Sequence, residues 1–270
     1  MEKHFGGGKL YLLAPSSPIQ MMGYVYRDAD SLIVIDGGME ADYPELKRII
    51  LQEKGSVDCL IITHCHLDHI GALTLLLEER EIPIKRILFD FPSFDLIDPI
   101  LQTEFERDLV RRFLKAAQNS GASLIRPKEG DEFRIGGNRI RFFKDGHLEN
   151  GDINDSSLVF KLETKGESIL FLGDVSPKCG DALARRFRDD PDFRADFIQL
   201  AHHGQQGGGK LLYQTLRGRY ALWNAPKWLY ENDGGGGPGT GPYRSDETKR
   251  WLVELGMESI FAFERTAIIE

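Results

Sequence analysis

Residues 63–69 read Thr63-His64-Cys65-His66-Leu67-Asp68-His69, and this stretch is the most informative in the 270-residue chain. It directly follows an apolar run, 59–62, of the kind expected for a strand that is buried on both faces. Alternate residues of an extended chain point the same way, so His64 and His66 are able to approach one metal ion. The sequence therefore predicts a metal site at the end of a buried strand.

The ligand types favour a catalytic site over a structural one. A tight turn after His66 is expected to bring Asp68 and His69 toward a second ion. Structural zinc sites normally use cysteines and fill all four coordination positions. Imidazole suits zinc, iron or nickel, and a neighbouring carboxylate suits a hard divalent ion or a bridging water. Cys65 lies between the ligands, and the alternation of the chain turns its thiol away from the metals.

Apolar patterning around this stretch predicts an α/β chain. Strands are predicted at 23–27, 31–36, 59–63, 86–89, 133–135, 139–143, 157–163, 168–172, 197–200, 259–262 and 266–269. Helices are predicted at 44–54, 71–79, 103–119, 180–188 and 245–255. No composition shift marks a domain boundary, so residues 1–270 are expected to form a single domain. Residues 1–9 are expected to be a disordered terminus, which leaves His4 without a function.

Composition limits the classes of function. The formal net charge of −8 argues against tight, non-specific binding to nucleic acid. Three cysteines, with no Cys-x-x-Cys pair, indicate no disulfide framework and favour a reducing compartment. The chain shows neither an apolar signal-peptide core nor a run long enough to span a membrane, which predicts a soluble, cytoplasmic protein without a membrane partner.

The histidine-rich stretch resembles the signature of the metallo-β-lactamase superfamily. Three other stretches resemble that family in the same order along the chain: Asp36-Gly37-Gly38, Leu170-Phe171-Leu172-Gly173-Asp174 and Ala201-His202-His203-Gly204. The resemblance implies an α/β fold of four layers, an αββα sandwich, with the metals at the edge where strand ends converge. It covers the chain from about residue 23 to the end.

Carried over position by position, the resemblance implies a site for two divalent metal ions, zinc first, with manganese, iron or nickel also accepted. The implied metal ligands are His64, His66, Asp68, His69, His147, Asp174 and His202. Asp174 is the implied bridge between the ions, and Asp68 also orients the bridging hydroxide. His203 is the alternative to His202 as the late ligand. If His202 binds metal, His203 is free to protonate the leaving group.

The third ligand of the first ion is the least defined position. The family places a histidine shortly before a serine-containing turn, and His147 precedes Ser156-Ser157 by a longer stretch than is usual. Either the loop is longer here, or Asp152 or Asn154 takes the place of the histidine. Thr63 and Ser156 are expected to orient the histidine rings from outside the site.

The predicted activity is binuclear hydrolysis, in which a hydroxide held between two ions attacks a phosphodiester or phosphoester. The runs 154–159 and 201–204 are similar to the domain attached to bacterial DNA-uptake channel proteins (ComEC-like) and its stand-alone relatives, although that branch often has an acidic residue in place of His66. Lys178, Lys210 and Arg244 are candidate phosphate anchors. The alternatives are an acyl-bond hydrolase acting on a lactone or thioester, a metal-binding protein without turnover, and a di-iron oxidoreductase. The sequence does not determine the oligomeric state.

Overall fold

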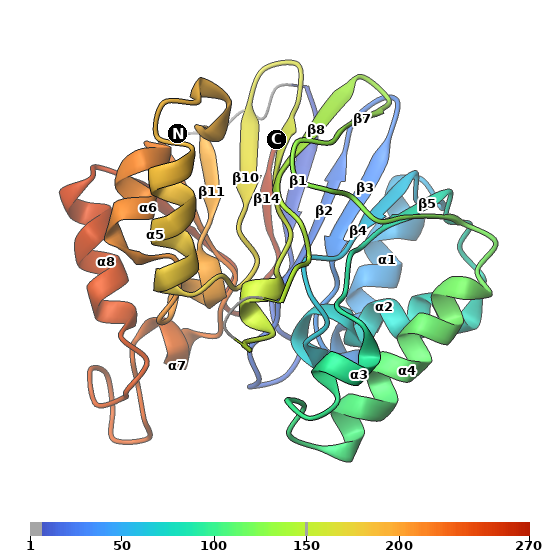
Figure 1. Ribbon diagram of the computed structural model, residues 1–270, viewed down its shortest axis with the longest axis horizontal. Coiled ribbons are helices and arrows are strands. Elements are labelled where there is room, and N and C mark those ends of the chain that lie inside the picture. The colour runs from blue at the N-terminus through green and yellow to red at the C-terminus, as the bar shows by residue number, and fades with distance from the viewer. Residues whose placement is uncertain (1–6, 149–150) are drawn as a thin grey trace.

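The computed structural model describes residues 7–148 and 151–270. Two seven-stranded sheets face each other in the centre, and helices cover the outer face of each sheet (Figure 1). This arrangement confirms the predicted four-layer αββα sandwich. No helix in the described part of the chain is long and apolar enough to cross a membrane.

The first sheet has the strand order β14-β1-β2-β3-β4-β5-β6. Its strands are β1 (Lys9–Leu12), β2 (Gly23–Arg27), β3 (Leu32–Asp36), β4 (Cys59–Ile61), β5 (Arg86–Leu88), β6 (Ser123–Ile125) and β14 (Ala267–Ile269). On its outer side lie η1 (Glu40–Asp42), α1 (Tyr43–Glu53), α2 (Leu67–Glu79), α3 (Phe94–Ile97) and α4 (Glu104–Gln118).

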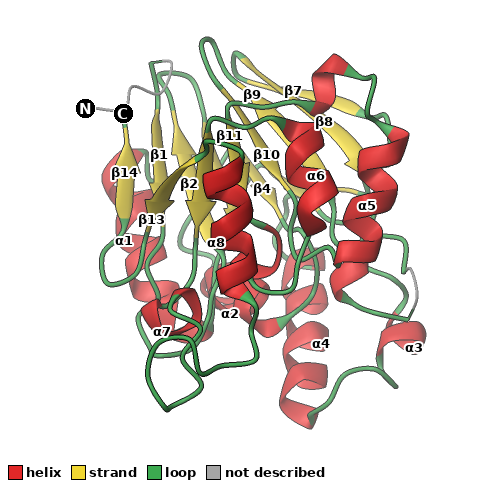
Figure 2. Cartoon of the chain, turned by 90° about the vertical axis from the view of Figure 1, so that its left-hand side faces the viewer, coloured by secondary structure: helices red, strands yellow, loops and turns green. Residues whose placement is uncertain are grey.

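The second sheet has the order β13-β12-β11-β10-β9-β8-β7. Its strands are β7 (Glu132–Ile135), β8 (Asn138–Lys144), β9 (Val159–Glu163), β10 (Ser168–Phe171), β11 (Phe197–Gln199), β12 (Tyr220–Trp223) and β13 (Glu258–Phe261). Its outer helices are α5 (Pro177–Arg186), α6 (Gly209–Leu216) and α8 (Ser245–Glu254), which stand side by side in Figure 2. The short elements η2 (Asn154–Ser156), η3 (Pro191–Phe193), η4 (Ala201–Gly204) and α7 (Lys227–Tyr230) lie in the connections.

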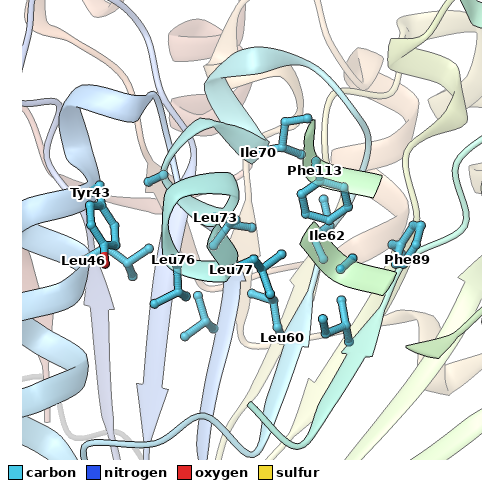
Figure 3. Packing of buried hydrophobic residues seen from close by; sticks show 14 of the residues in the cluster. Tyr43, Leu46, Leu60, Ile62, Ile70, Leu73, Leu76, Leu77, Phe89 and Phe113 are labelled. Carbon is cyan, nitrogen blue, oxygen red and sulfur yellow. The ribbon is translucent and has the colours of Figure 1, made fainter. Parts of the chain in front are cut away.

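Three apolar clusters hold the four layers together. Between the sheets, the ring of Phe171 stacks on Phe160 at 5.0 Å and meets the edge of Tyr24 at 5.3 Å. On the outer side of the first sheet, Leu73 and Phe113 pack over the strands (Figure 3), and both are completely buried. Each such side chain contributes about 1.5–3 kcal/mol by leaving water, so these interfaces fix the positions of the strand ends.

The strand directions bring the predicted site residues to one edge of the molecule. β3 and β4 are parallel neighbours in the first sheet, and β10 and β11 are parallel neighbours in the second. The connections that leave the carboxyl ends of these four strands carry the Asp36-Gly37-Gly38 turn, the histidine-rich stretch, Asp174 and the His202-His203 pair. Neighbouring parallel strands end on the same side, so residues far apart in the sequence meet there.

The local structure differs from the sequence-based prediction at two places near the site. α2 begins at Leu67 rather than at Gly71, so Asp68 and His69 lie in its first turn and not in a loop. Gly71 lets this helix approach η1, because a Cβ atom there would lie 2.5 Å from the backbone nitrogen of Glu40. At the N-terminus, Lys9 begins β1 although it falls in the stretch predicted to be disordered, and residues 1–6 lie outside the described residues.

Candidate metal centre

Two groups of histidine and aspartate side chains lie at this edge, and their ligand atoms fall within 4.8 Å of one another in each group. The first metal group consists of His64, His66 and Asp174. The second metal group consists of Asp68, His69 and His203. Six of the predicted metal and catalytic residues, from three separate segments of the chain, are thus brought together.

Asp174 joins the two groups. Its Oδ2 lies 3.9 Å from Nε2 of His64 in the first group. The same oxygen lies 3.3 Å from Nε2 of His69 and 3.5 Å from Nε2 of His203 in the second group. A single carboxylate oxygen therefore faces both groups, which is the geometry of a bridging ligand.

The unpaired atoms of the centre suit a bound cation. Nε2 of His69, Nε2 of His203 and Oδ1 of Asp174 are buried and have no hydrogen-bond partner among the described residues. Burial alone would lower the pKa of His203, but Asp174 and Asp68 raise it to about 10. Burial would likewise raise the pKa of Asp68, whereas the charges of His69 and His203 lower it. The carboxylates thus favour positive charge in a buried space, and divalent ions would supply that charge and give these nitrogen atoms a ligand bond in place of the missing hydrogen bond.

Residues outside the two groups fix the orientation of the rings in the second metal group. Nδ1 of His69 lies 2.8 Å from Oδ2 of Asp36, and both residues are completely buried. Nδ1 of His203 lies 3.0 Å from the carbonyl oxygen of Asn224, to which it donates a hydrogen bond. A proton on Nδ1 leaves Nε2 of each ring free to bind metal, as in many zinc sites.

The first metal group has serine and threonine partners. Nδ1 of His64 lies 3.2 Å from Oγ1 of Thr63 and 3.3 Å from Oγ of Ser157. Thr63 therefore has the predicted position, but Ser156 does not, because its hydroxyl donates to the carbonyl oxygen of Ile153. Ser157 takes that place, since its Oγ also accepts a hydrogen bond from the backbone nitrogen of Asp174 at 2.9 Å.

Asp68 is held by Gln20, which is itself held by Gln205, and the sequence analysis missed both glutamines. Nε2 of Gln20 donates to Oδ2 of Asp68 at 3.0 Å, and Nε2 of Gln205 donates to Oε1 of Gln20 at 2.7 Å. Neither glutamine, nor Asn224 beside His203, lies in a motif with defined spacing. No pattern in a single sequence distinguishes these residues from ordinary loop residues.

The structure separates the roles of the two adjacent late histidines. His203, predicted as the proton donor, lies in the buried second metal group, whereas His202, predicted as the ligand, does not. The His202 side chain is 25% exposed, and its Nε2 lies 4.0 Å from Oδ2 of Asp174. Both residues have left-handed backbone angles, with φ of 52° and 55°, which turn the two rings in different directions. The geometry thus favours the alternative in which His203 is the late ligand, and His202 lines the pocket instead.

His147 is not brought to either metal group. Its side chain is exposed and lines another cleft, beside Asp90 and Lys128. Of the two alternatives for this ligand, Asp152 accepts a hydrogen bond from the backbone nitrogen of Asn154 at 2.9 Å, whereas the Asn154 side chain lines the pocket above the metal groups. Of the three candidates for this ligand, only Asn154 therefore lines the pocket at the metal groups.

A pocket of about 470 Å³ opens onto both metal groups. Its described lining residues are Pro18, Ile19, Gln20, His66, Leu67, Asp68, Gln102, Glu106, Asn154, Asp174, His202 and Trp228. None of these is lysine or arginine. Of the three predicted phosphate anchors, Lys210 pairs with Glu254, Arg244 pairs with Glu247, and Lys178 does not line this pocket. The described pocket wall therefore combines an apolar part, formed by Pro18, Ile19, Leu67 and Trp228, with acidic and neutral polar side chains.

The fold and the paired histidine–aspartate groups define a class of protein. The family model described as the metallo-beta-lactamase superfamily matches residues 22–255, and the chain belongs to that superfamily. ComE operon protein 3 of Bacillus subtilis (strain 168) is 28% identical over 172 residues, which are 63% of this chain and 20% of that protein. The match confirms the resemblance to the ComEC-like branch, although the chain spans only a fifth of the relative.

Solved structures show the same fold. The metallo-β-lactamase fold protein YhfI from Bacillus subtilis aligns with a TM-score of 0.61 and 14% identity over 97% of this chain and 98% of its own. CmlA, a diiron β-hydroxylase from Streptomyces venezuelae, aligns with a TM-score of 0.58 and 11% identity over 98% of this chain and 54% of its own. At these identities the likeness concerns the fold alone.

Proposed function

We propose that the chain is a binuclear metallohydrolase that cleaves an ester bond of a small organic substrate, with a phosphodiester or phosphoester as the first candidate. The observation that carries this proposal is the position of Asp174 between two buried ligand groups. One ion is proposed to bind His64, His66 and Asp174, and the other to bind Asp68, His69, His203 and Asp174. Zinc is the first candidate for both ions, and manganese, iron or nickel also suit such ligands.

Two divalent ions in such a site supply a water of lowered pKa and neutralise the negative charge that develops on the substrate oxygen. The chain positions the reactants around them. Asp68, held by Gln20, presents its carboxylate to both the second metal group and the pocket. His202 lies on the pocket wall, where its ring is placed to hydrogen-bond the substrate. It takes the substrate-facing place that the sequence analysis gave to His203.

The pocket limits the kind of phosphodiester. A nucleic-acid strand is normally bound through many phosphate contacts with lysine and arginine. The described lining of this pocket has neither, and it presents Ile19, Leu67 and Trp228 instead. Ions bound by the metal groups would therefore be the main anchor for negative charge in this pocket, which suits a substrate with one anionic group and an apolar body.

The same observation favours a second candidate, hydrolysis of an uncharged acyl bond such as a lactone or thioester. Such a substrate requires no basic anchor, because its carbonyl oxygen becomes anionic only as the reaction proceeds. The apolar wall formed by Ile19, Leu67 and Trp228 suits its organic portion equally well.

The test measures metal content and hydrolysis on the same preparations. Wild-type protein, Asp68→Asn and a matched control, Asp30→Asn, which changes an exposed turn residue, are loaded with metal and analysed by elemental analysis. Each is assayed with bis(p-nitrophenyl) phosphate, p-nitrophenyl acetate and a lactone. Two metals per chain, with diester cleavage lost only in Asp68→Asn, would establish the first candidate. Cleavage of the acyl substrates alone would establish the second, and two metals without any turnover would refute both.

A further inference from the structure

We propose that the side-chain oxygen of Asn154 is the remaining protein ligand of the first metal site, and that this site consequently binds its ion more weakly than the second. The inference rests on the two-metal centre of the proposed function. It adds a ligand and an order of metal loading, with the second site filled first.

The side-chain oxygen of Asn154 is one of a few described buried polar atoms that lack a hydrogen-bond partner. Oδ1 of Asn154 is buried and has no hydrogen-bond partner among the described residues. A buried carbonyl oxygen without a partner costs about 1–3 kcal/mol, so such atoms are rare in folded proteins. The other described atoms of this kind are Tyr24 Oη, His69 Nε2, Asp174 Oδ1 and His203 Nε2, and three of these four belong to the metal groups. Asn154 lines the same pocket as Asp174, which contributes one of these three atoms.

The backbone on both sides of Asn154 is fixed, while its side chain is not committed elsewhere. The carboxylate of Asp155 accepts hydrogen bonds from the backbone nitrogen and Oγ of Ser176 at 2.8 and 2.9 Å, which ties η2 to the start of α5. The backbone oxygen of Asn154 accepts from the nitrogen of Ser157 at 3.1 Å. Ser157 in turn contacts Nδ1 of His64 and the backbone nitrogen of Asp174, both in the first metal group. These contacts tie η2 to that group and leave the side-chain oxygen of Asn154 without a described partner.

The two metal groups differ in the protein ligands that they offer. The second has Asp68, His69 and His203, and the oxygen of Asp174 adds a fourth ligand close to both of its rings. The first has His64, His66 and Asp174 alone. A catalytic zinc ion usually takes three protein ligands and a water and can expand to five ligands, so the first group offers one protein ligand fewer than the second. A neutral amide oxygen completes the first set, but it is a poorer zinc ligand than imidazole and suits a harder ion such as manganese better.

The experiment titrates metal-free, full-length protein with Zn²⁺ and, separately, with Mn²⁺ by calorimetry. Wild-type protein should bind two ions with clearly unequal affinities. Asn154→Ala should weaken the lower-affinity site at least about tenfold without changing the other, and Asn154→His should tighten the lower-affinity site for Zn²⁺. Titration with Co²⁺ should show a shifted visible absorption for the weaker site in Asn154→His. Asn119→Ala, an exposed asparagine at the end of α4, is the matched control and should behave as wild type.

Several results would overturn the proposal. Unchanged metal affinities in Asn154→Ala with a higher KM would show that Asn154 binds substrate, and a parallel loss at both sites would show an indirect effect. Circular dichroism of the metal-free variants checks folding. If Asn154→Ala does not fold, the Zn²⁺ titration of Asn154→His is the test of the ligand role. An unchanged affinity at the weaker site of that variant would refute it. Failure of the proposed function would give a different result. The metal affinities would change as expected in the Asn154 variants, but the wild-type protein would cleave no ester.

Discussion

Oδ2 of Asp36 lies 2.8 Å from Nδ1 of His69, and neither side chain is exposed to solvent. Asp36 also accepts hydrogen bonds from the backbone nitrogen and hydroxyl of Thr63, at 2.8 and 2.7 Å. A turn residue at the end of β3 therefore connects the start of the histidine-rich stretch with the second metal group. Loss of such a carboxylate usually lowers metal affinity, because the ring of the ligand is no longer held in one tautomer.

Asp36→Asn should reduce metal affinity at the second site by about 10–100-fold. Asparagine tolerates the positive φ of 49° at this position, so the backbone is retained, but its amide nitrogen would face the ring N–H of His69. Calorimetric metal titration measures the loss, with Asp30→Asn as the control. Wild-type affinity in Asp36→Asn would mean that this carboxylate does not orient the ligand.

Replacing His202 and replacing His203 should have different effects on metal content and on kcat. His203→Ala should lose one of the two bound ions, because Nε2 of His203 lies 3.2 Å from Asp68 and 3.5 Å from Asp174 within the second metal group. His202→Ala should keep both ions and lower kcat, since its ring lies on the pocket wall. Elemental analysis and kinetics on the same samples separate the two. The reverse pattern would restore His202 as the ligand.

His147→Ala should bind both ions and turn over substrate like wild type. Its side chain is exposed and lies in another cleft, so it makes no contribution to either metal group in the structure. Metal content and kcat/KM provide the check, with His66→Ala as the positive control for ligand loss. A missing metal in His147→Ala would show that the loop brings this histidine to the centre when ions bind.

Asp58 should make folding stability depend on pH in the acid range. Burial would raise its pKa, but Lys54, Lys85 and the backbone nitrogen of Leu32 lower it to about 2. A lowered pKa in the folded state means that the stabilisation is present above the unfolded value of about 3.9 and is lost as the pH falls toward 2. Urea unfolding of metal-free protein at pH 6 and pH 3 measures this difference. Asp58→Asn should be less stable at pH 6 and should show a smaller pH dependence, and an unchanged dependence would contradict the assignment.

The sequence determined the fold and the centre of the site because both are encoded by patterns that extend over only a few consecutive residues. Seven consecutive residues after a buried strand placed His64, His66, Asp68 and His69 together, and the apolar hairpin before Asp174 located the carboxylate that lies between the two metal groups. The alternation of apolar residues likewise indicated most of the strands in both sheets. Patterns of this kind depend on chain geometry over a few residues, so a single sequence is enough to reveal them.

Tertiary structure alone decided the residues that surround this centre. The choice between His202 and His203 depends on two left-handed backbone positions, which no periodic pattern describes. Gln20 and Asn154 reach the site from connections whose path is set by packing against distant elements rather than by their own sequence. The direction of a side chain in an irregular segment depends on long-range contacts, and those contacts exist only when the two sheets have come together.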